Sequence, residues 1–314
     1  MELLELPDSI QIETAMACNL RCPMCPVPES KTTMDGRNPG IMPIARFSSL
    51  LNQISDKPRI LGLTLMGEPL INKRVATFVR MAKERGHWVA LTTNATLLTE
   101  ETARDLLEAG LDMCKVSFDG TTRETYERIR IGANYDSVIA NVRHFSELRK
   151  TLGRPCQLHI HCIESDLTRG EIGAFADMWK DIADDTQILG LSDWFGQFEV
   201  PPEFGLRPAA VPVTTDENAQ PPEGCHFLWQ VLSISNNGQV IFCCFDYKLA
   251  SNLPSLMDKP LIDIWNDEMA IERQKHRENK VDKAPCLTCA HWAKIKSLKN
   301  LAATGKSEPP RSGT

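Results

Sequence analysis

The sequence lacks the features that mark several large classes of protein. It has no excess of positive charge, because 35 Lys and Arg residues face 41 Asp and Glu residues and leave a formal net charge of −6. Nucleic-acid-binding surfaces are basic, so this balance argues against a nucleic-acid substrate. No apolar run approaches the roughly 20 residues needed to cross a bilayer, so we expect no transmembrane helix.

The N-terminal segment also lacks the marks of an exported protein. MELLELPDSIQIE is acidic and has neither the basic region nor the apolar stretch of a signal peptide. Eleven cysteines in a chain without an export signal are better explained as metal ligands or free thiols than as disulfides. We therefore expect a cytoplasmic protein in which cysteines hold metal.

The length and composition are those of a globular protein. Its 314 residues, 42% of them hydrophobic, suit one large domain with a small additional module. Over the first 190 residues strands and helices alternate about six times, which is the pattern of parallel βαβ units. The expected strands are SIQIE, ILGLTLMGEP, WVALTTN, CKVSFDG, QLHIHCIE and QILGLS, and the expected helices are IARFSSLLNQI, RVATFVRMAKERG, EETARDLLEAG, YDSVIANVRHFSELRK and EIGAFADMWKDI.

Each expected strand has one apolar face and one polar face. QLHIHCIE, for example, places Leu158, Ile160 and Cys162 opposite its two histidines. Side chains alternate between the two faces of a strand, so one face packs on helices while the other borders a solvated space. A sheet covered on both sides is apolar on both, and a complete eight-stranded barrel is filled with aliphatic side chains. The pattern predicts a partial (β/α)6 barrel with a polar cavity, lined by Glu13, Lys115, His159 and His161.

Three cysteines follow the first strand within eight positions, at Cys18, Cys22 and Cys25. The next cysteine is Cys114, so this group has no fourth ligand nearby in the sequence. A structural metal site is normally closed by four protein ligands, whereas three thiolates can hold three irons of a [4Fe–4S] cluster and leave the fourth open. An open position is typical of a catalytic metal site. A zinc knuckle or three buried thiols are the alternatives.

The spacing C-x3-C-x2-C resembles the signature of the radical S-adenosylmethionine (SAM) superfamily. The resemblance implies that the open iron binds the amine and carboxylate of SAM, and that one electron cleaves SAM to a 5′-deoxyadenosyl radical. MGEP resembles the GGEP motif of the family, with Met66 in place of the first glycine. Each polar residue at a strand end is also an ordinary turn residue. The implied SAM contacts are Met24, Gly67, Glu68, Pro69, Asn94, Ser117 and Asp119.

A second group of cysteines lies toward the C-terminus. VLSISNNGQVIFCC predicts a hairpin with an Asn-Gly turn, and PLIDIWNDEMAIERQKHRE predicts a helix. The arrangement resembles the SPASM/twitch module, which carries auxiliary iron–sulfur clusters in many radical SAM enzymes. No cysteine follows Cys289, so the shorter form with one auxiliary [4Fe–4S] cluster is implied, and a four-cysteine zinc site is the alternative. The implied ligands are Cys225, Cys243, Cys286 and Cys289.

The stretch 193–223 interrupts the repeat with six prolines and no periodicity. So long a stretch is a linker or a functional loop, and its aromatic residues are too apolar for a solvated tether. These residues are Trp194, Phe195, Phe198 and Phe204. We expect the stretch to cross the barrel mouth and help to cover the substrate. The predicted organisation is a barrel at 1–192, this loop at 193–224, the SPASM/twitch module at 225–300 and a disordered tail at 301–314.

Four cysteines fall outside both groups. Cys114 and Cys162 lie on apolar strand faces and are expected to be core thiols, and Cys156 has no role that the sequence assigns. Cys244 adjoins an implied cluster ligand, but neighbouring residues of a strand face opposite ways. Its thiol is therefore either structural or free to face the cavity as a catalytic hydrogen donor.

The reaction class follows from the resemblance and from Cys244. A radical formed on the substrate can take back hydrogen from a thiol on its other face, which is epimerisation. It can also lose an electron to the auxiliary cluster and a proton to a base, which is dehydrogenation, or attack another atom to form a cross-link. We expect epimerisation, with Cys244 as the donor.

The substrate class is inferred from the start of the chain. The first strand begins almost at the N-terminus, so we expect this protein to lack the domain with which many SPASM enzymes bind peptides. This favours a carbohydrate-like small molecule, such as a sugar or aminocyclitol of antibiotic biosynthesis, with flavodoxin or ferredoxin as the electron donor. A peptide maturase is the next candidate, and an iron–sulfur electron carrier or scaffold is the candidate from another class.

Overall fold

The computed structural model describes residues 3–27, 40–194, 196–206 and 225–289. The strands are β1 (Ser9–Ile12), β2 (Ile60–Gly62), β3 (Trp88–Thr93), β4 (Met113–Ser117), β5 (Gln157–Glu164), β6 (Asp185–Gly190), β7 (Val231–Ile234) and β8 (Val240–Ile241). The helices are α1 (Ile44–Ile54), α2 (Val75–Lys83), α3 (Glu100–Glu108), α4 (Arg123–Ile129), α5 (Tyr135–Thr151), α6 (Ile172–Trp179), α7 (His226–Gln230), α8 (Leu261–Asn266) and α9 (Glu268–Arg277).

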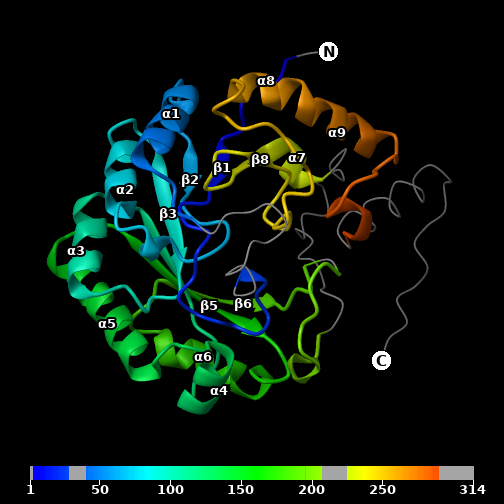
Figure 1. Ribbon diagram of the computed structural model, residues 1–314. Helices are drawn as coiled ribbons and strands as arrows, with labels where there is room; N and C mark the ends of the chain where they lie inside the picture. The colour runs from blue at the N-terminus through cyan, green and yellow to red at the C-terminus, as the bar shows by residue number, and fades with distance from the viewer. Residues whose placement is uncertain (1–2, 28–39, 195, 207–224, 290–314) are drawn as a thin grey trace, which may run out of the picture.

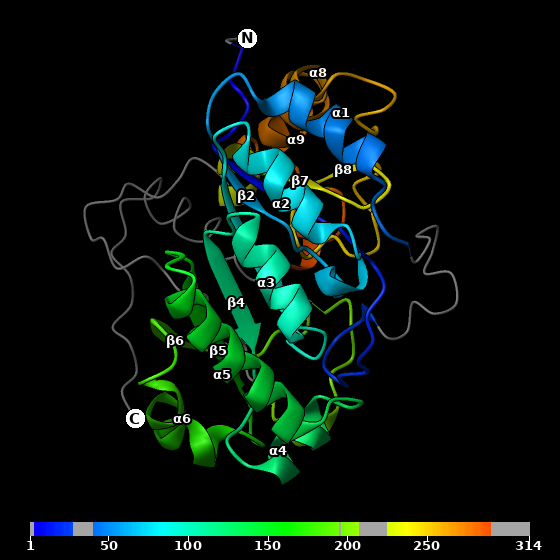
Figure 2. The ribbon, with the colours of Figure 1, turned by 90° about the vertical axis from the view of Figure 1, so that its left-hand side faces the viewer.

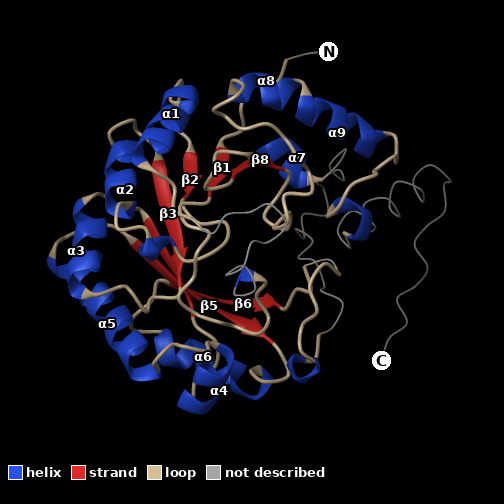
Figure 3. Ribbon diagram, in the orientation of Figure 1, coloured by secondary structure: helices blue, strands red, loops and turns tan. Residues whose placement is uncertain are grey.

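One sheet forms the centre of the fold, with its strands in the order β6-β5-β4-β3-β2-β1-β7-β8. Every neighbouring pair is parallel except β7 and β8, which are antiparallel. The strands from β1 to β6 form an arc, with α1, α2, α3 and α5 outside it and loops inside it (Figure 1, Figure 3). This arrangement confirms the predicted partial barrel. Among the described residues, no helix has the length and apolar character needed to span a membrane.

The hydrophobic core lies between the sheet and its outer helices, which follow one another along one side of the molecule (Figure 2). Buried and half-buried residues alternate along β3 and β4, as the two-faced strand pattern predicts. Phe47 of α1 stacks on Phe78 of α2 with ring centroids 4.3 Å apart, so neighbouring helices share one core. Cys114 and Cys162 are buried in this core, as expected.

Two helical features differ from the sequence prediction. α4 was not predicted, although the Thr122 side chain caps it by accepting a hydrogen bond from the N–H of Thr125. The helix expected at 260–278 is divided into α8 and α9 at Asp267. The guanidinium of buried Arg273 donates to the carbonyl of Trp265, an acceptor that the next turn of a continuous helix would use. This contact between residues eight positions apart has no signature in the sequence.

The predicted hairpin is present as β7 and β8, but its attachment was not predicted. β7 pairs in parallel with β1, so the C-terminal module extends the barrel sheet. Asn236 in the hairpin turn donates its N–H to the Glu13 carboxylate at 3.2 Å, and its carbonyl accepts from Arg46 at 2.8 Å. Glu13 is fully buried at this junction, where its carboxylate holds the hairpin turn, and its expected place in the cavity wall stays a prediction.

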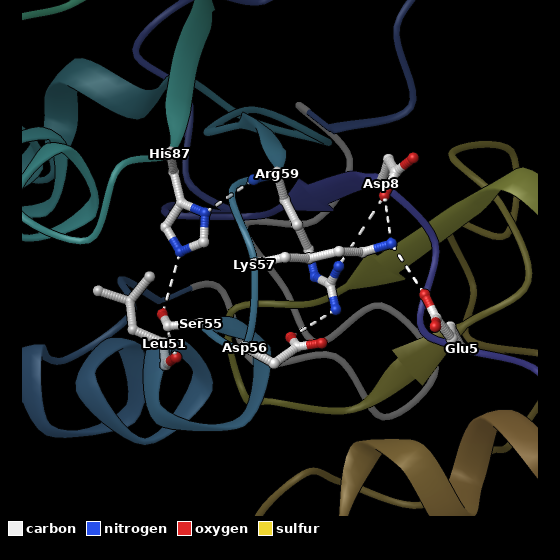
Figure 4. Close-up of polar contacts among 8 residues, drawn as sticks. All are labelled: Glu5, Asp8, Leu51, Ser55, Asp56, Lys57, Arg59 and His87. Carbon is white, nitrogen blue, oxygen red and sulfur yellow. Dashed lines mark hydrogen bonds and ion pairs between the residues drawn. The ribbon is translucent and has the colours of Figure 1, made fainter.

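A polar network joins the segments before β1, β2 and β3 (Figure 4). Arg59 is buried, and its guanidinium lies 2.6 Å from Asp56 and 4.0 Å from Asp8. The ring of buried His87 accepts the backbone N–H of Arg59 at 3.1 Å and contacts the Ser55 hydroxyl at 3.0 Å. These contacts fix the amino ends of the strands and leave the carboxyl ends for chemistry, as is usual for barrels of this kind.

Candidate active site

The loop after β1 brings Cys18, Cys22 and Cys25 together. Cys22 is buried and the other two are half-buried. The N–H of Cys25 donates to the carbonyl of Cys22 at 3.0 Å, and the N–H of Leu20 points to the sulfur of Cys18 at 3.4 Å. Burial raises the pKa of Cys18 to about 11 and that of Cys25 to about 12. The thiols are therefore protonated without metal, and metal binding must displace their protons.

Gly67 of the MGEP motif packs directly on this loop. Its φ is +71°, and a Cβ there would lie 2.3 Å from the carbonyl oxygen of Ala15. The next N–H, from Glu68, donates to the carbonyl of Ala17 at 2.9 Å. Only glycine tolerates both this φ and so close an approach to the Ala15 carbonyl. This accounts for the retention of the second glycine of the GGEP motif as Gly67.

Met66, the departure from the motif, fills an apolar contact. It is buried in a cluster with Met16, Val27 and Tyr247, the last of which belongs to the C-terminal module. A glycine at this position would leave that space open. Met66 therefore joins the cysteine loop to the C-terminal module.

The carboxylate of Glu68 is buried at the end of β3. It accepts hydrogen bonds from the Thr93 hydroxyl at 2.6 Å, from the N–H of Asn94 at 2.7 Å and from the N–H of Leu70 at 3.1 Å. Burial nevertheless raises its pKa to about 7. A carboxylate has about four lone-pair positions, so one remains for a further donor such as an amine. Pro69, also buried, begins the single 3-10 turn that follows (Pro69–Ile71).

Asn94 lies against the cysteine loop. Its Nδ2 donates to Oδ1 of Asn19 at 3.1 Å and lies 3.9 Å from the sulfur of Cys18. Its Oδ1 accepts from the N–H of Thr96 at 2.9 Å. The sequence prediction missed Asn19, whose position directly after Cys18 is its only signal.

Asp119 reaches the cysteine loop through a cation that the sequence prediction also missed. Its carboxylate is fully buried, accepts the N–H of Ile163 at 2.7 Å and forms a 2.7 Å ion pair with Arg130. Arg130 in turn donates to the sulfur of Cys22 at 3.9 Å. Burial opposes the charge of Arg130, but the adjacent Asp119 raises its pKa. A buried cation beside a thiolate stabilises negative charge on sulfur.

Ser117 and His161 are partners across neighbouring strands. They are paired in the β4–β5 register, and the Ser117 hydroxyl lies 2.8 Å from Nε2 of His161. Burial lowers the pKa of His161 to about 4, so its ring is neutral at physiological pH. Met24, the remaining predicted SAM contact, is buried in an apolar cluster with Leu20 and Leu191.

The second cysteine group is centred on Cys225. Burial and then the nearby thiols of Cys225 and Cys289 raise the pKa of Cys286. Burial and then the thiols of Cys244, Cys225 and Cys286 raise the pKa of Cys243 well above its usual value. The four predicted ligands are thus neighbours although the first and the last are 64 positions apart in the sequence. Cys244 lies with them, and burial raises its pKa to about 12.

The arrangement of these cysteines bears on the metal that they can hold. Within the described residues, no three His, Cys, Asp or Glu side chains are grouped to hold a single metal ion. A [4Fe–4S] cluster does not require such a group, because each thiolate binds a different iron. Soft thiolates are also the donors that these clusters select.

Part of the predicted covering loop is described. Phe204 is buried with Leu20 of the cysteine loop, and its carbonyl accepts the N–H of Asp166 at 2.9 Å. Trp194 lies between the cysteine loop and the C-terminal module. Phe195, residues 207–224, the end of the predicted module at 290–300 and the predicted tail at 301–314 lie outside the described residues.

Comparison with known families identifies two domains in the chain. A sequence model of the radical SAM superfamily matches residues 12–160, and a model of the SPASM iron-sulfur cluster-binding domain matches residues 225–290. The chain is a radical SAM enzyme with a C-terminal SPASM domain. Radical SAM domains hold a [4Fe–4S] cluster that binds SAM, and SPASM domains hold an auxiliary iron–sulfur cluster. The two clusters and SAM are therefore the cofactors of this enzyme.

The curated relatives of this radical SAM enzyme have diverse activities. It is 32% identical to the tungsten-containing aldehyde ferredoxin oxidoreductase cofactor-modifying protein of Pyrococcus furiosus over 112 residues, 35% of this chain and 30% of that protein. It spans 58% or less of the GTP 3′,8-cyclases that it also matches. It is 25% identical to the PqqA peptide cyclase of Granulibacter bethesdensis over 318 residues, 92% of this chain and 81% of that protein.

Solved structures share its fold. SuiB of Streptococcus suis bound to precursor peptide SuiA matches with a TM-score of 0.71 and 17% identity, over 93% of this chain and 71% of SuiB. BtrN in complex with AdoMet and 2-DOIA matches with a TM-score of 0.54 and 20% identity, over 86% of this chain and 87% of BtrN. At these identities the likeness of the radical SAM enzyme to both is one of fold.

Proposed function

We propose that this radical SAM enzyme epimerises one carbon of a small polar molecule, such as a sugar or aminocyclitol, with Cys244 as the hydrogen donor. When bound, the catalytic cluster and SAM supply the 5′-deoxyadenosyl radical that removes hydrogen from the substrate carbon. The chain would hold the cluster through Cys18, Cys22 and Cys25, and SAM through Met24, Gly67, Glu68, Pro69, Asn94, Ser117 and Asp119.

The position of Cys244 carries the proposal. Its thiol neighbours Cys225 among the auxiliary cysteines. The next residue, Phe245, packs on Trp194, whose indole N–H reaches the carbonyl of Met24 between the catalytic cysteines. The segment that carries Cys244 thus extends from one cysteine group to the other. We propose that the Cys244 thiol reaches a substrate held between them.

The proposed step exchanges one S–H bond for one C–H bond. The S–H bond of Cys244 breaks and a C–H bond forms on the face opposite the one that lost hydrogen. An external donor such as flavodoxin or ferredoxin gives one electron for SAM cleavage. It gives a second electron to the Cys244 thiyl radical, which takes a proton from solvent and becomes a thiol again. Each turnover consumes one SAM, because 5′-deoxyadenosine keeps the hydrogen that it took.

Polar groups on the concave face support a hydroxylated or amino substrate. Ser117 and the neutral ring of His161 offer a hydroxyl and an imidazole at adjacent strand ends. Lys115 and His159 lie on the same face of β4 and β5 and are half-buried. Such groups bind hydroxyls and amines by hydrogen bonds.

The test is Cys244→Ala in heavy water, with a panel of sugars and aminocyclitols. The wild-type enzyme should place one deuterium on the inverted carbon, because a thiol exchanges its hydrogen with solvent. The variant should still form 5′-deoxyadenosine but lose inversion and deuterium. Cys156→Ala, which removes a buried thiol elsewhere in the barrel, is the matched control and should behave as wild type. If Cys244→Ala makes the same product at the normal rate, Cys244 is a structural thiol.

Dehydrogenation is the second candidate, favoured by the closeness of Cys244 to the auxiliary cysteines around Cys225. An auxiliary cluster held there would supply a one-electron acceptor for the substrate radical, and the hydroxyl proton would pass to a base. The product would then be a ketone, and no solvent deuterium would remain on carbon.

Peptide modification is the third candidate, favoured by the match to PqqA peptide cyclase over 92% of the chain. It predicts that a precursor peptide, rather than a sugar, stimulates 5′-deoxyadenosine formation. A peptide gene beside this one would identify the sequence to test.

A further inference from the structure

Trp194 contacts both cysteine-bearing segments at once. Its indole N–H donates to the carbonyl of Met24 at 3.3 Å, within the loop that holds Cys22 and Cys25. The same ring packs edge-on against Phe245 and Tyr247, with centroids 5.7 Å apart in both pairs. Edge-to-face aromatic pairs add stability beyond the area that they bury.

The backbone around Trp194 is tied to the C-terminal module as well. The amide of Gln197 donates to the carbonyl of Trp194 at 2.8 Å and to that of Phe245 at 3.1 Å. The Tyr247 hydroxyl donates to the carbonyl of Gln197 at 2.6 Å. We call Trp194, Gln197, Phe245 and Tyr247 the Trp194 bridge.

Trp194 adopts a backbone conformation that bulky residues rarely take. Its φ is +55°, in the left-handed region that disfavours any residue with a Cβ. Such strain persists only where surrounding contacts hold the residue in place, and it concentrates at functional sites. The contacts to Met24, Phe245 and Tyr247 hold Trp194 here, together with the Ser192 hydroxyl, which accepts the Trp194 backbone N–H at 3.0 Å.

The catalytic side of the bridge is well packed. Tyr247 is buried with Met16, Val27 and Met66, and Cys18, Cys25 and Trp194 pack against that cluster. The bridge therefore touches the cysteine loop through one hydrogen bond and through an apolar contact surface. A shift of Phe245 or Tyr247 would be transmitted to the turn between Cys22 and Cys25.

We propose that Trp194 is a positioning residue that fixes the catalytic cysteine loop relative to the auxiliary cysteine segment. It acts through the Met24 carbonyl on one side and through the rings of Phe245 and Tyr247 on the other. This role depends on the two cofactor-binding families and not on the reaction that Cys244 performs. It remains testable if the proposed epimerisation fails.

The experiment compares Trp194→Phe and Trp194→Ala in the fully reconstituted enzyme. Phenylalanine keeps a ring against Phe245 and Tyr247 but cannot donate to Met24, whereas alanine loses both contacts. The control is Trp88→Ala, which removes another half-buried tryptophan at the start of β3, the end of the strand away from Asn94. Three properties are measured. They are the hydrogen exchange of residues 18–27 and 243–249, the total iron, and the microwave-power saturation of the reduced clusters.

Both Trp194 variants should keep about eight irons. Trp194→Phe should speed amide exchange in 18–27 about fivefold, the effect of one lost hydrogen bond, and leave 243–249 unchanged. Trp194→Ala should speed exchange in both segments. It should also alter the saturation of the catalytic cluster signal, because magnetic relaxation depends on the distance to the second cluster. Trp88→Ala should change none of these.

Unchanged exchange in 18–27 together with unchanged saturation in both Trp194 variants overturns the proposal. Equal effects of Trp88→Ala also overturn it, because they indicate general loosening. If Trp194→Ala cannot hold iron, Trp194→Phe decides through its selective effect on 18–27.

Discussion

At the scale of single residues, Gly67 illustrates how one backbone angle serves the site. Its positive φ turns the chain after β2 so that Glu68 bonds to Ala17 and faces the end of β3. The carbonyls of Ala15 and Ala17 leave no room for a Cβ. Gly67 thus places the acidic residue and the cysteine loop side by side.

Gly67→Ala should therefore damage the catalytic group. Strain at a positive φ together with the overlap with Ala15 should lower the free energy of unfolding by about 3 kcal/mol or more. Reconstituted iron should fall from about eight to about four per chain, because only the loop after β1 is displaced. Urea unfolding and iron analysis measure both effects.

Gly173→Ala is the control for this substitution. Gly173 lies in α6, and the position that a Cβ would take there has no neighbouring atom within 4 Å. Alanine should therefore be neutral or stabilise the protein by up to about 1 kcal/mol. Full iron content in Gly67→Ala would show that the loop tolerates the side chain.

At the scale of elements, the pairing of β4 with β5 determines the charge of the concave face. The register brings Ser117 opposite His161, and burial keeps the histidine ring neutral by lowering its pKa to about 4. An unfolded histidine titrates near pH 6.5. Between these values the unfolded chain binds a proton that the native chain does not.

The free energy of unfolding should therefore fall as the pH falls from about 6.5 toward 4. Above pH 6.5 the histidine is neutral in both states, so His161 should cause no further change. His161→Gln should flatten that part of the profile. Ser117→Ala should keep it, because burial and not the hydroxyl is the main cause of the pKa shift. Urea unfolding of the protein without iron, at a series of pH values, gives the measurement. An unchanged profile in His161→Gln would assign the acid sensitivity to another group.

At the scale of the whole molecule, the C-terminal module and the barrel form one sheet. β7 pairs with β1, Arg46 bonds to the hairpin turn, and Tyr247 packs beside Met66. The first strand thus leads directly into the cysteine loop and also pairs with the C-terminal module. Two cysteine groups built far apart in the sequence share one framework.

Two separate clusters should nevertheless load independently. The reconstituted enzyme should hold about eight irons. Replacing Cys18, Cys22 and Cys25 together with alanine should leave about four and abolish SAM cleavage. Replacing Cys225, Cys243, Cys286 and Cys289 should also leave about four but spare SAM cleavage without substrate. A triple variant that keeps all its iron would contradict the assignment of the catalytic group.

The local patterns of the sequence determined much of this protein. The alternation of apolar and polar residues along the strands predicted the barrel and its two faces, because a strand of period two has to place them so. The three cysteines after the first strand predicted an open metal site, because the number and type of ligands follow from the sequence alone. Gly67 and Glu68 were predicted because a motif of adjacent residues is local.

Only the tertiary structure decided which distant groups meet. Nothing local indicates that β7 lies beside β1, that Arg130 reaches both Asp119 and Cys22, or that Glu13 is used at a domain junction. The same holds for Trp194, whose partners Met24 and Phe245 lie on segments far from it in the sequence. Such contacts form because packing the whole chain brings these segments together, and the free energy that selects them belongs to the assembled core and not to any short stretch.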